Sequence, residues 1–147
     1  ESDLPKGRGW APFFWQVIEC KNTIPVVLFE ASSGMDEGDI YLKSYIQLEG
    51  HELHDELREK QAQVTMELVE EFIDKFSVVN LTKTPQKSEP TYYPKRSPKD
   101  SELDVDKTIA EQFNLLRTVN NEDFPAYFEY FGHKYVLRID KVEDFNE

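Results

Sequence analysis

A long amphipathic segment, residues 52–76, places the strongest constraint on how this chain folds. Its large apolar side chains recur four or seven positions apart, which puts them on one face of an α-helix. Glutamate and lysine fill the other faces. The apolar side chains are Leu53, Leu57, Val64, Leu68, Phe72 and Phe76. The pattern predicts a single helix over this segment, the longest in the chain.

Two strand signals precede this helix. Residues 24–31 form an almost continuous apolar run, which is typical of a strand covered on both faces. Residues 40–48 alternate apolar and polar side chains, which is typical of a half-buried strand. One loop joins them, so we predict an antiparallel pair in an α/β fold. An open α/β sheet needs more strands than these, and we therefore expect that sequence belonging to the sheet is missing before Glu1.

A short helix and a proline-rich stretch flank these elements. Pro12 fits the first turn of a helix over residues 13–19, because the amide proton that proline lacks has no helical partner there. Residues 82–99 contain four prolines and have neither helical nor strand periodicity. A stretch of this length is either a linker or a long functional loop.

The C-terminal part predicts a small annex. Thr108 and Glu111 have the spacing of a capping box, in which both side chains bind free amides at the start of a helix. Residues 126–130 and 134–140 predict a hairpin that turns around Gly132.

Composition narrows the classes of partner. Aspartate and glutamate number 29 against 17 lysines and arginines, and the net charge of −12 repels polyanions such as tRNA. Cys20 is the only cysteine, which excludes an intrachain disulfide, and we predict it to be a small buried apolar side chain. No apolar run approaches the roughly 20 residues that span a bilayer. We expect a cytoplasmic protein with no membrane or nucleic-acid partner.

The acidic loop between the two predicted strands has two interpretations. Residues 35–39 read Met-Asp-Glu-Gly-Asp, and Asp36 at a strand end would orient a histidine and stabilise its charged form. The alternative is an ordinary turn with solvated acidic residues, since aspartate and glycine are common turn residues.

A second candidate site lies in the proline-rich stretch. Tyr92 and Tyr93 offer flat faces for a nucleobase, and the guanidinium of Arg96 offers a fork for phosphate oxygens. The alternative is a connector whose aromatic side chains pack on the main domain. A metal site is not predicted, because His51 and His54 are three positions apart rather than four and no third ligand accompanies them.

Two stretches taken together carry a family resemblance. Residues 2–12 read Ser-Asp-Leu-Pro-Lys-Gly-Arg-Gly-Trp-Ala-Pro. With the acidic loop, they resemble the folate-dependent formyltransferase superfamily, which moves a formyl unit onto an amine. Residues 91–102 and 107–117 resemble the C-terminal region of bacterial sugar N-formyltransferases, which formylate nucleotide-linked deoxyamino sugars. The resemblance implies the C-terminal half of a Rossmann-like formyltransferase domain, followed by a small α+β annex.

The resemblance also implies a catalytic set. In the superfamily a loop aspartate joins an asparagine and a histidine, and Asp36 stands at the matching position. The amine attacks the formyl carbon of formyl-tetrahydrofolate, the asparagine and the protonated histidine stabilise the oxyanion, and the aspartate holds the histidine. The family's histidine directly precedes the first stretch. The chain opens at Glu1, one residue too late to carry it, and the asparagine is also absent. We therefore expect this chain to be incomplete for catalysis.

Binding residues follow from the same resemblance, and no metal is implied. The loop implied to line the pterin pocket contributes Ala31, Ser32, Gly34, Met35 and Gly38. The residues implied to hold the nucleotide are Tyr92, Tyr93, Lys95 and Arg96, with Lys6 and Arg8 as further candidates whose alternative is a solvated loop.

The prediction is a nucleotide-sugar N-formyltransferase, present as a fragment. Residues 1–81 would be the second half of the catalytic domain, residues 82–106 a substrate-binding loop or linker, and residues 107–147 a helix and hairpin annex. Two alternatives stay open: a methionyl-tRNA formyltransferase, which the acidic balance and short annex disfavour, and a non-catalytic folate- or nucleotide-binding remnant. An exposed sheet edge in a lone fragment also predicts a homo-oligomer or association with a missing N-terminal segment.

Overall fold

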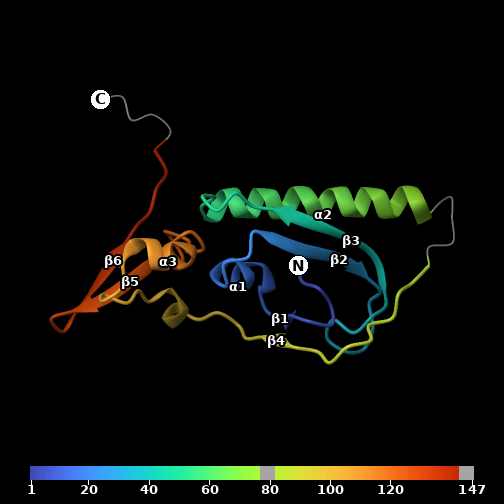
Figure 1. The fold of residues 1–147 in the computed structure, drawn as a ribbon, viewed down its shortest axis with the longest axis horizontal. Coiled ribbons are helices and arrows are strands. Elements are labelled where there is room, and N and C mark those ends of the chain that lie inside the picture. Colours follow the sequence, from blue (N-terminus) through green and yellow to red (C-terminus); the bar gives the residue numbers. More distant parts are fainter. Residues whose placement is uncertain (77–81, 143–147) are drawn as a thin grey trace.

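A two-stranded antiparallel sheet and a long helix form the centre of the fold (Figure 1). The computed structural model describes residues 1–76 and 82–142. The sheet consists of β2 (Thr23–Phe29) and β3 (Ile40–Gln47), and α2 (His54–Phe76) runs alongside both strands. The predicted α/β class, the antiparallel pair and the long helix are confirmed.

One apolar core joins the sheet to both helices of this half. α1 (Pro12–Ile18) begins with its proline in the first turn, as predicted, and adds aromatic side chains to the core. The buried members are Phe13, Phe14, Val17, Ile24, Val26, Ile46, Leu48, Leu57 and Leu68. Each large apolar side chain buried in this way contributes about 1.5–3 kcal/mol.

The register of the sheet explains which side chains enter this core. Ile24 lies opposite Ile46, and residues that face each other across an antiparallel pair point to the same side. Both side chains are fully buried. The other face of β2 is only half-buried, so the expectation of a strand covered on both faces was wrong. Val27 and Phe29 on that face line a cavity beside the N-terminal segment rather than a packed layer.

Two side chains differ from the sequence-based expectation of burial. Cys20 is exposed, because it follows the end of α1 with φ 65°, a conformation that ends a helix and directs the side chain outward. Phe76 is also exposed. Phe72 packs on Tyr41 near the first residue of β3, and Phe76 lies one turn further along the helix.

The backbone of the proline-rich stretch pairs with the backbone of the domain at two places. Thr84 exchanges backbone hydrogen bonds with Ile40 at the start of β3. Further on, β4 (Tyr92–Tyr93) pairs in parallel with β1 (Arg8–Gly9). Gly9 permits this close approach, because a Cβ there would lie 2.5 Å from the carbonyl oxygen of Tyr93. Segments more than 80 positions apart therefore lie side by side.

The C-terminal annex has its own small core. α3 (Ile109–Leu116) begins with the predicted capping box of Thr108 and Glu111. A 3₁₀ turn, η1 (Pro98–Ser101), leads into it. The buried apolar members are Leu103, Leu116, Val119 and Ala126.

The predicted hairpin completes the annex. It consists of β5 (Ala126–Tyr130) and β6 (His133–Leu137), and Gly132 has the positive φ of 76° that its turn requires. Among the helices of the described residues, none combines the length and the apolar character needed to cross a membrane.

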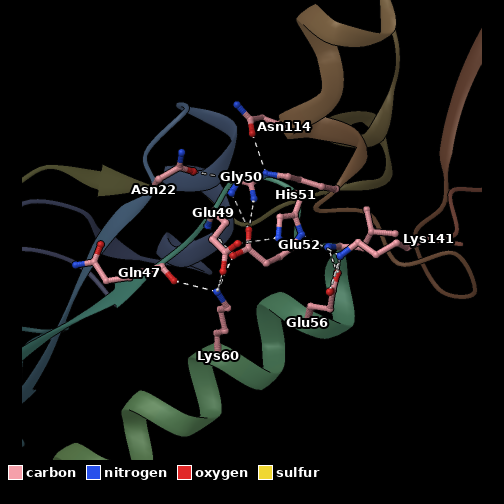
Figure 2. A network of polar contacts seen from close by, with 12 residues as sticks. Asn22, Gln47, Glu49, Gly50, His51, Glu52, Glu56, Lys60, Asn114 and Lys141 are labelled. Carbon is pink, nitrogen blue, oxygen red and sulfur yellow. Dashed lines mark hydrogen bonds and ion pairs between the residues drawn. The ribbon is translucent and has the colours of Figure 1, made fainter. Parts of the chain in front are cut away.

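A buried ion pair joins the annex to the main core (Figure 2). Arg117, at the end of α3, lies 3.1 Å from Glu52, just before α2, and both side chains are fully buried. The guanidinium also donates to the side-chain oxygens of Asn114 and Asn22, at 2.8 and 3.1 Å. Lys60 on α2 contacts the second oxygen of Glu52 at 2.7 Å. We call these five residues the buried joint.

The buried joint satisfies the carboxylate of Glu52 almost completely. Burial alone would raise its pKa, but hydrogen bonds from Lys60 and from the backbone amides of Glu49 and Gly50 outweigh that effect. Together they lower the pKa of Glu52 to about 2. The carboxylate is therefore charged at neutral pH, which is what Arg117 requires.

Candidate active-site loop and its surroundings

Asp36 is held in the loop between β2 and β3 by contacts from two distant segments. Its φ of 55° is left-handed, a conformation that aspartate and asparagine adopt more readily than most residues. Oδ2 accepts the backbone N–H of Gly9 at 3.0 Å. The side-chain amide of Gln86 donates to the carbonyl oxygens of Asp36 and Gly38, at 2.8 and 2.7 Å. The loop is thus fixed by the N-terminal segment and by the proline-rich stretch.

A cavity of about 130 Å³ lies beside Asp36. The first residues of the chain and the outer face of β2 form its walls. These lining residues are Glu1, Ser2, Leu4, Gly9, Pro12, Val27 and Phe29. Oδ1 of Asp36 has no hydrogen-bond partner among the described residues. The half-buried carboxylate therefore adjoins the amino terminus and keeps one oxygen available to a ligand or a further side chain.

The five residues predicted to line a pterin pocket do not line this cavity. Ala31, Ser32 and Met35 are exposed, while Gly34 is half-buried and Gly38 is buried. A Cβ at Gly38 would lie 1.7 Å from the carbonyl oxygen of Glu30, so the close return of the loop requires glycine. The role of these residues toward a pterin stays a prediction.

Arg8 is buried, so the solvated-loop alternative does not describe it. One terminal nitrogen donates to Oε1 of Gln86 at 2.7 Å, and the other lies 3.3 Å from Oε1 of Glu37. The hydroxyl of Tyr92 is 3.5 Å from that second nitrogen. Nε of Arg8 is buried and has no partner within the described ranges. Lys6, the other candidate in this stretch, is exposed.

The adjacent tyrosines have different surroundings. Tyr92 is exposed beside Arg8. Tyr93 stacks on Trp15 with ring centroids 6.3 Å apart, and its hydroxyl donates to Glu19 at 2.8 Å. Burial first and that hydrogen bond second raise the pKa of Tyr93. The connector interpretation thus fits Tyr93, while Tyr92 remains accessible to a ligand.

Lys95 and Arg96 have surroundings different from those of Arg8 and Tyr92. The ammonium of Lys95 lies 5.3 Å from the ring centroid of the exposed Trp10. Arg96 lines a second cavity, of about 160 Å³, together with Arg58 and His54. The residues assigned to one nucleotide site are therefore divided between the surroundings of Asp36 and this second cavity.

Sequence reasoning missed three of the side chains in these two places. Gln86 lies in the stretch without periodicity, where no pattern marks a residue that fixes a loop. Arg58 is on the polar face of α2, and His54 was weighed only as a metal ligand. No group of three or more histidine, cysteine, aspartate or glutamate side chains in residues 1–76 and 82–142 is placed to hold a metal ion.

Curated sequences similar to the chain are methionyl-tRNA formyltransferases. The protein from Fervidobacterium nodosum is 38% identical over 115 residues, covering 78% of this chain and 36% of the relative. The one from Acetivibrio thermocellus is 30% identical over 143 residues, covering 96% and 45%. By sequence, the chain is related to the folate-dependent formyltransferase superfamily. It spans less than half the length of these relatives, and no family model matches it.

Solved formyltransferase structures share the fold. Methionyl-tRNA formyltransferase from Clostridium thermocellum aligns with a TM-score of 0.77 at 20% identity, covering 97% of this chain and 61% of that one. A sugar N-formyltransferase from Shewanella aligns at 0.71 and 20%, covering 97% and 60%. HypX from Aquifex aeolicus, solved with tetrahydrofolic acid, aligns at 0.69 and 19%, covering 90% and 23%. The predicted formyltransferase fold, as a part of the longer domain, is confirmed.

Proposed function

We propose that residues 1–147 supply the aspartate half of an N-formyltransferase whose acceptor is the amino group of a nucleotide-linked deoxyamino sugar. The observation that carries the proposal is the state of Asp36. It is fixed by Gly9 through one carboxylate oxygen, and the other is free beside the first residues of the chain. In the superfamily pattern the catalytic histidine directly precedes those residues. A carboxylate with one bound and one free oxygen is suited to orient that imidazole.

The cavity beside Asp36 fits only part of a folate. Sites for drug-sized molecules usually have volumes of about 300–1,000 Å³, whereas this one has about 130 Å³. A formyl group and an attacking amine fit this volume, and the exposed flank of Ala31, Ser32 and Met35 can form one wall for a pterin. In this proposal, residues outside these 147 supply the remaining walls, the histidine and the asparagine.

Formyl-tetrahydrofolate, when bound, would supply the formyl carbon: as the acceptor nitrogen bonds to this carbon and loses a proton, the bond from the carbon to the folate nitrogen breaks, and tetrahydrofolate leaves with a proton on that nitrogen. The residues of this chain position the groups that react. Asp36 would hold the histidine in the orientation in which its charged form faces the developing oxyanion, and would stabilise that charge. Gly9 and Gln86 keep Asp36 from rotating away, because they fix its side chain and its backbone separately.

The test is formyl transfer by the complete reading frame that encodes residues 1–147. Asp36→Asn is expected to lower turnover at least about 100-fold, the usual size of a contribution to proton transfer and charge stabilisation. Glu122→Gln removes a carboxylate on the annex surface and serves as the control, with turnover expected to stay unchanged. Near-normal turnover of Asp36→Asn would remove this residue from the catalytic role.

A second candidate function is that of a methionyl-tRNA formyltransferase. The observation that favours it is the name of the curated relatives described above. The net charge of −12 opposes it, since each phosphate contact on tRNA needs a cation. Parallel assays with a nucleotide-linked amino sugar and with initiator methionyl-tRNA distinguish the two. If the enzyme formylates the methionyl-tRNA and not the amino sugar, the acceptor is the tRNA and the sugar proposal is wrong.

We also propose that the chain associates with itself or with the segment that completes the sheet. Among the described strands, β2 pairs only with β3, so its second edge has free backbone groups. Sedimentation of the 147-residue chain tests this proposal, and a stable monomer at all concentrations would contradict it.

A further inference from the structure

The ion pairs of the arginines separate them into two groups. Arg8, Arg117 and Arg138 each form an ion pair with a glutamate. Arg58 and Arg96 form none with any carboxylate of the described residues. In a chain with 29 acidic residues, two guanidinium groups with no carboxylate at ion-pair distance are unexpected, although the charge of Asp100 still acts on Arg96 over a longer range. They point to a ligand that supplies the negative charge.

Both guanidinium groups line the same cavity, the second one described above, of about 160 Å³. The imidazole of His54 is on its wall, and no carboxylate is among the lining residues. Hydroxyl and amide groups complete the polar lining. They belong to Ser97, Ser101, Thr118 and Asn120. The hydroxyls of Ser97 and Thr118 already donate to Oδ2 of Asp100 and to the carbonyl oxygen of Leu115, both at 2.8 Å. The cavity therefore combines two permanent cations with the neutral donors of Ser101 and Asn120.

An aromatic ring holds these cations in place without neutralising them. The guanidinium carbon of Arg58 lies 4.5 Å from the ring centroid of Phe14, and that of Arg96 lies 6.0 Å away. The ring of His54 stacks on Phe14 at 5.3 Å with an angle of 1° between the planes. Cation–π attraction of this kind positions a charge and leaves its N–H groups available.

Arg96 is fixed further by backbone carbonyl groups. Its two terminal nitrogens donate to the carbonyl oxygens of Thr118 and Asp100, at 3.3 and 3.4 Å. These bonds use two of the five N–H groups of a guanidinium. Burial lowers the pKa of Arg96, although the charge of Asp100 opposes this effect. The side chain is thus a desolvated cation with donors to spare.

We propose that this cavity binds a phosphoanion, with Arg58 and Arg96 as the two guanidinium ligands and the hydroxyl of Ser101 as an additional donor. Guanidinium groups match phosphate oxygens in a two-point geometry. The volume is about ten times the ~10–15 Å³ that one water molecule needs, so a diphosphate is a suitable size. No previously assigned candidate except Arg96 belongs to this set.

A nucleoside diphosphate is the source that fits the rim of the cavity. Phe124 is 56% exposed there and offers a flat face to a base. The identification of the anion as the diphosphate of a nucleotide-linked sugar rests on the proposed function. The anion site itself does not, because its argument uses only the charges and contacts of the cavity.

Calorimetric titration of the 147-residue chain with inorganic pyrophosphate and with UDP tests the proposal. We expect saturable binding of both, with tighter binding of UDP, and a loss of affinity of about tenfold or more in Arg58→Gln and in Arg96→Gln, as for other charge-assisted contacts. Arg138→Gln removes the same charge from the annex surface and is expected to bind like the unaltered chain. Arg58 is exposed on α2, so Arg58→Gln is expected to keep the fold. It therefore still tests the site if Arg96→Gln fails to fold.

The outcomes separate the site from the function. Absence of saturable pyrophosphate binding, or equal losses in Arg138→Gln, would overturn the phosphoanion site. Binding of folinic acid without pyrophosphate would overturn it also, by assigning the arginines to the carboxylates of a folate. Equal affinity for UDP and pyrophosphate would support the anion site but would mean that the nucleoside makes no contact there.

The proposed function can fail separately. Pyrophosphate binding by the chain, together with no formyl transfer by the complete reading frame, would support the anion site and contradict the proposed function.

Discussion

The buried joint and the Asp36 loop use charged side chains in opposite ways. In the joint, Glu52 and Arg117 are fully buried, and each has further polar partners. In the loop, Asp36 is half-buried and one of its oxygens has no partner among the described residues, while Nε of neighbouring Arg8 is buried without one. The fully bonded network stabilises the fold, and the open one leaves hydrogen-bonding capacity for a ligand.

This difference shows that burial of a charge does not by itself mark a functional site. Glu52 has a pKa lowered to about 2, a shift that often accompanies catalytic residues. Every cause of this shift is structural, because the hydrogen bonds that lower the pKa come from the turn before α2 and from Lys60. The stretch that carries the family motif is instead the Asp36 loop, where one carboxylate oxygen has no partner among the described residues. Substitutions in the two regions should therefore differ in their effect on the free energy of unfolding.

The largest effect is expected from Glu52→Gln. The variant leaves Arg117 buried without its counter-charge, and breaking a buried ion pair from one side costs about 3–5 kcal/mol. Urea denaturation measures the change in the free energy of unfolding. Glu122→Gln breaks the exposed pair with Arg138 and should cost no more than about 1 kcal/mol. Equal losses in the two variants would contradict the distinction between joint and surface.

The second largest effect is expected from acid, which should weaken the interactions of the carboxylate of Glu52 in the buried joint. A carboxyl group whose pKa falls from 4.5 to about 2 on folding stabilises the protein fully above pH 4.5. The stabilisation disappears as the pH falls from 4.5 to 2, because protons then bind the unfolded state preferentially. The shift corresponds to about 3 kcal/mol. Denaturation at a series of pH values measures the slope, and Glu52→Gln should flatten it; an unchanged slope would assign the acid sensitivity to other carboxyl groups.

The local elements of both regions could be predicted from sequence, because their signals are local. The capping box of Thr108 and Glu111 depends on a spacing of three residues, and the helix over 52–76 depends on its apolar period. The Asp36 loop was singled out differently, through its resemblance to a family motif, and the catalytic role of Asp36 stays a prediction. The joint could not be found by such signals, since Glu52 and Arg117 are 65 positions apart and each looks like an ordinary surface residue.

Chain path also explains why the candidate site was predicted only in part. Tyr92, Tyr93, Lys95 and Arg96 are close neighbours in sequence and were assigned to one pocket. In the structure, β4 aligns Tyr92 with Arg8, whereas the chain then leaves the sheet and carries Arg96 to the cavity of Arg58. The direction of the chain after a two-residue strand is set by tertiary contacts, which no spacing in the sequence encodes.

An intermediate effect is expected from Arg8→Met. The variant removes hydrogen bonds to Gln86 and Glu37 but also removes the buried Nε that has no partner, so the two changes partly offset each other. A loss of about 1–2 kcal/mol is expected. Arg138→Met, at an exposed pair, should lose less than about 1 kcal/mol. A loss of about 3 kcal/mol or more is the size expected when a buried ion pair is broken. Such a loss in Arg8→Met would mean that Arg8 stabilises the fold as the buried joint does, rather than keeping hydrogen-bonding capacity for a ligand.

The smallest effect is expected from Asp36→Asn, the variant that removes activity in the proposed function. Asparagine also adopts the left-handed backbone and can accept the N–H of Gly9, so stability should change by no more than about 0.5 kcal/mol. Asp36→Ala lacks both properties and should lose about 1–2 kcal/mol. Thermal unfolding of the three proteins side by side makes the comparison. If Asp36→Asn destabilises as much as Asp36→Ala, the charge itself holds the loop together, and lost activity in the variant would then no longer separate a catalytic role from a structural one.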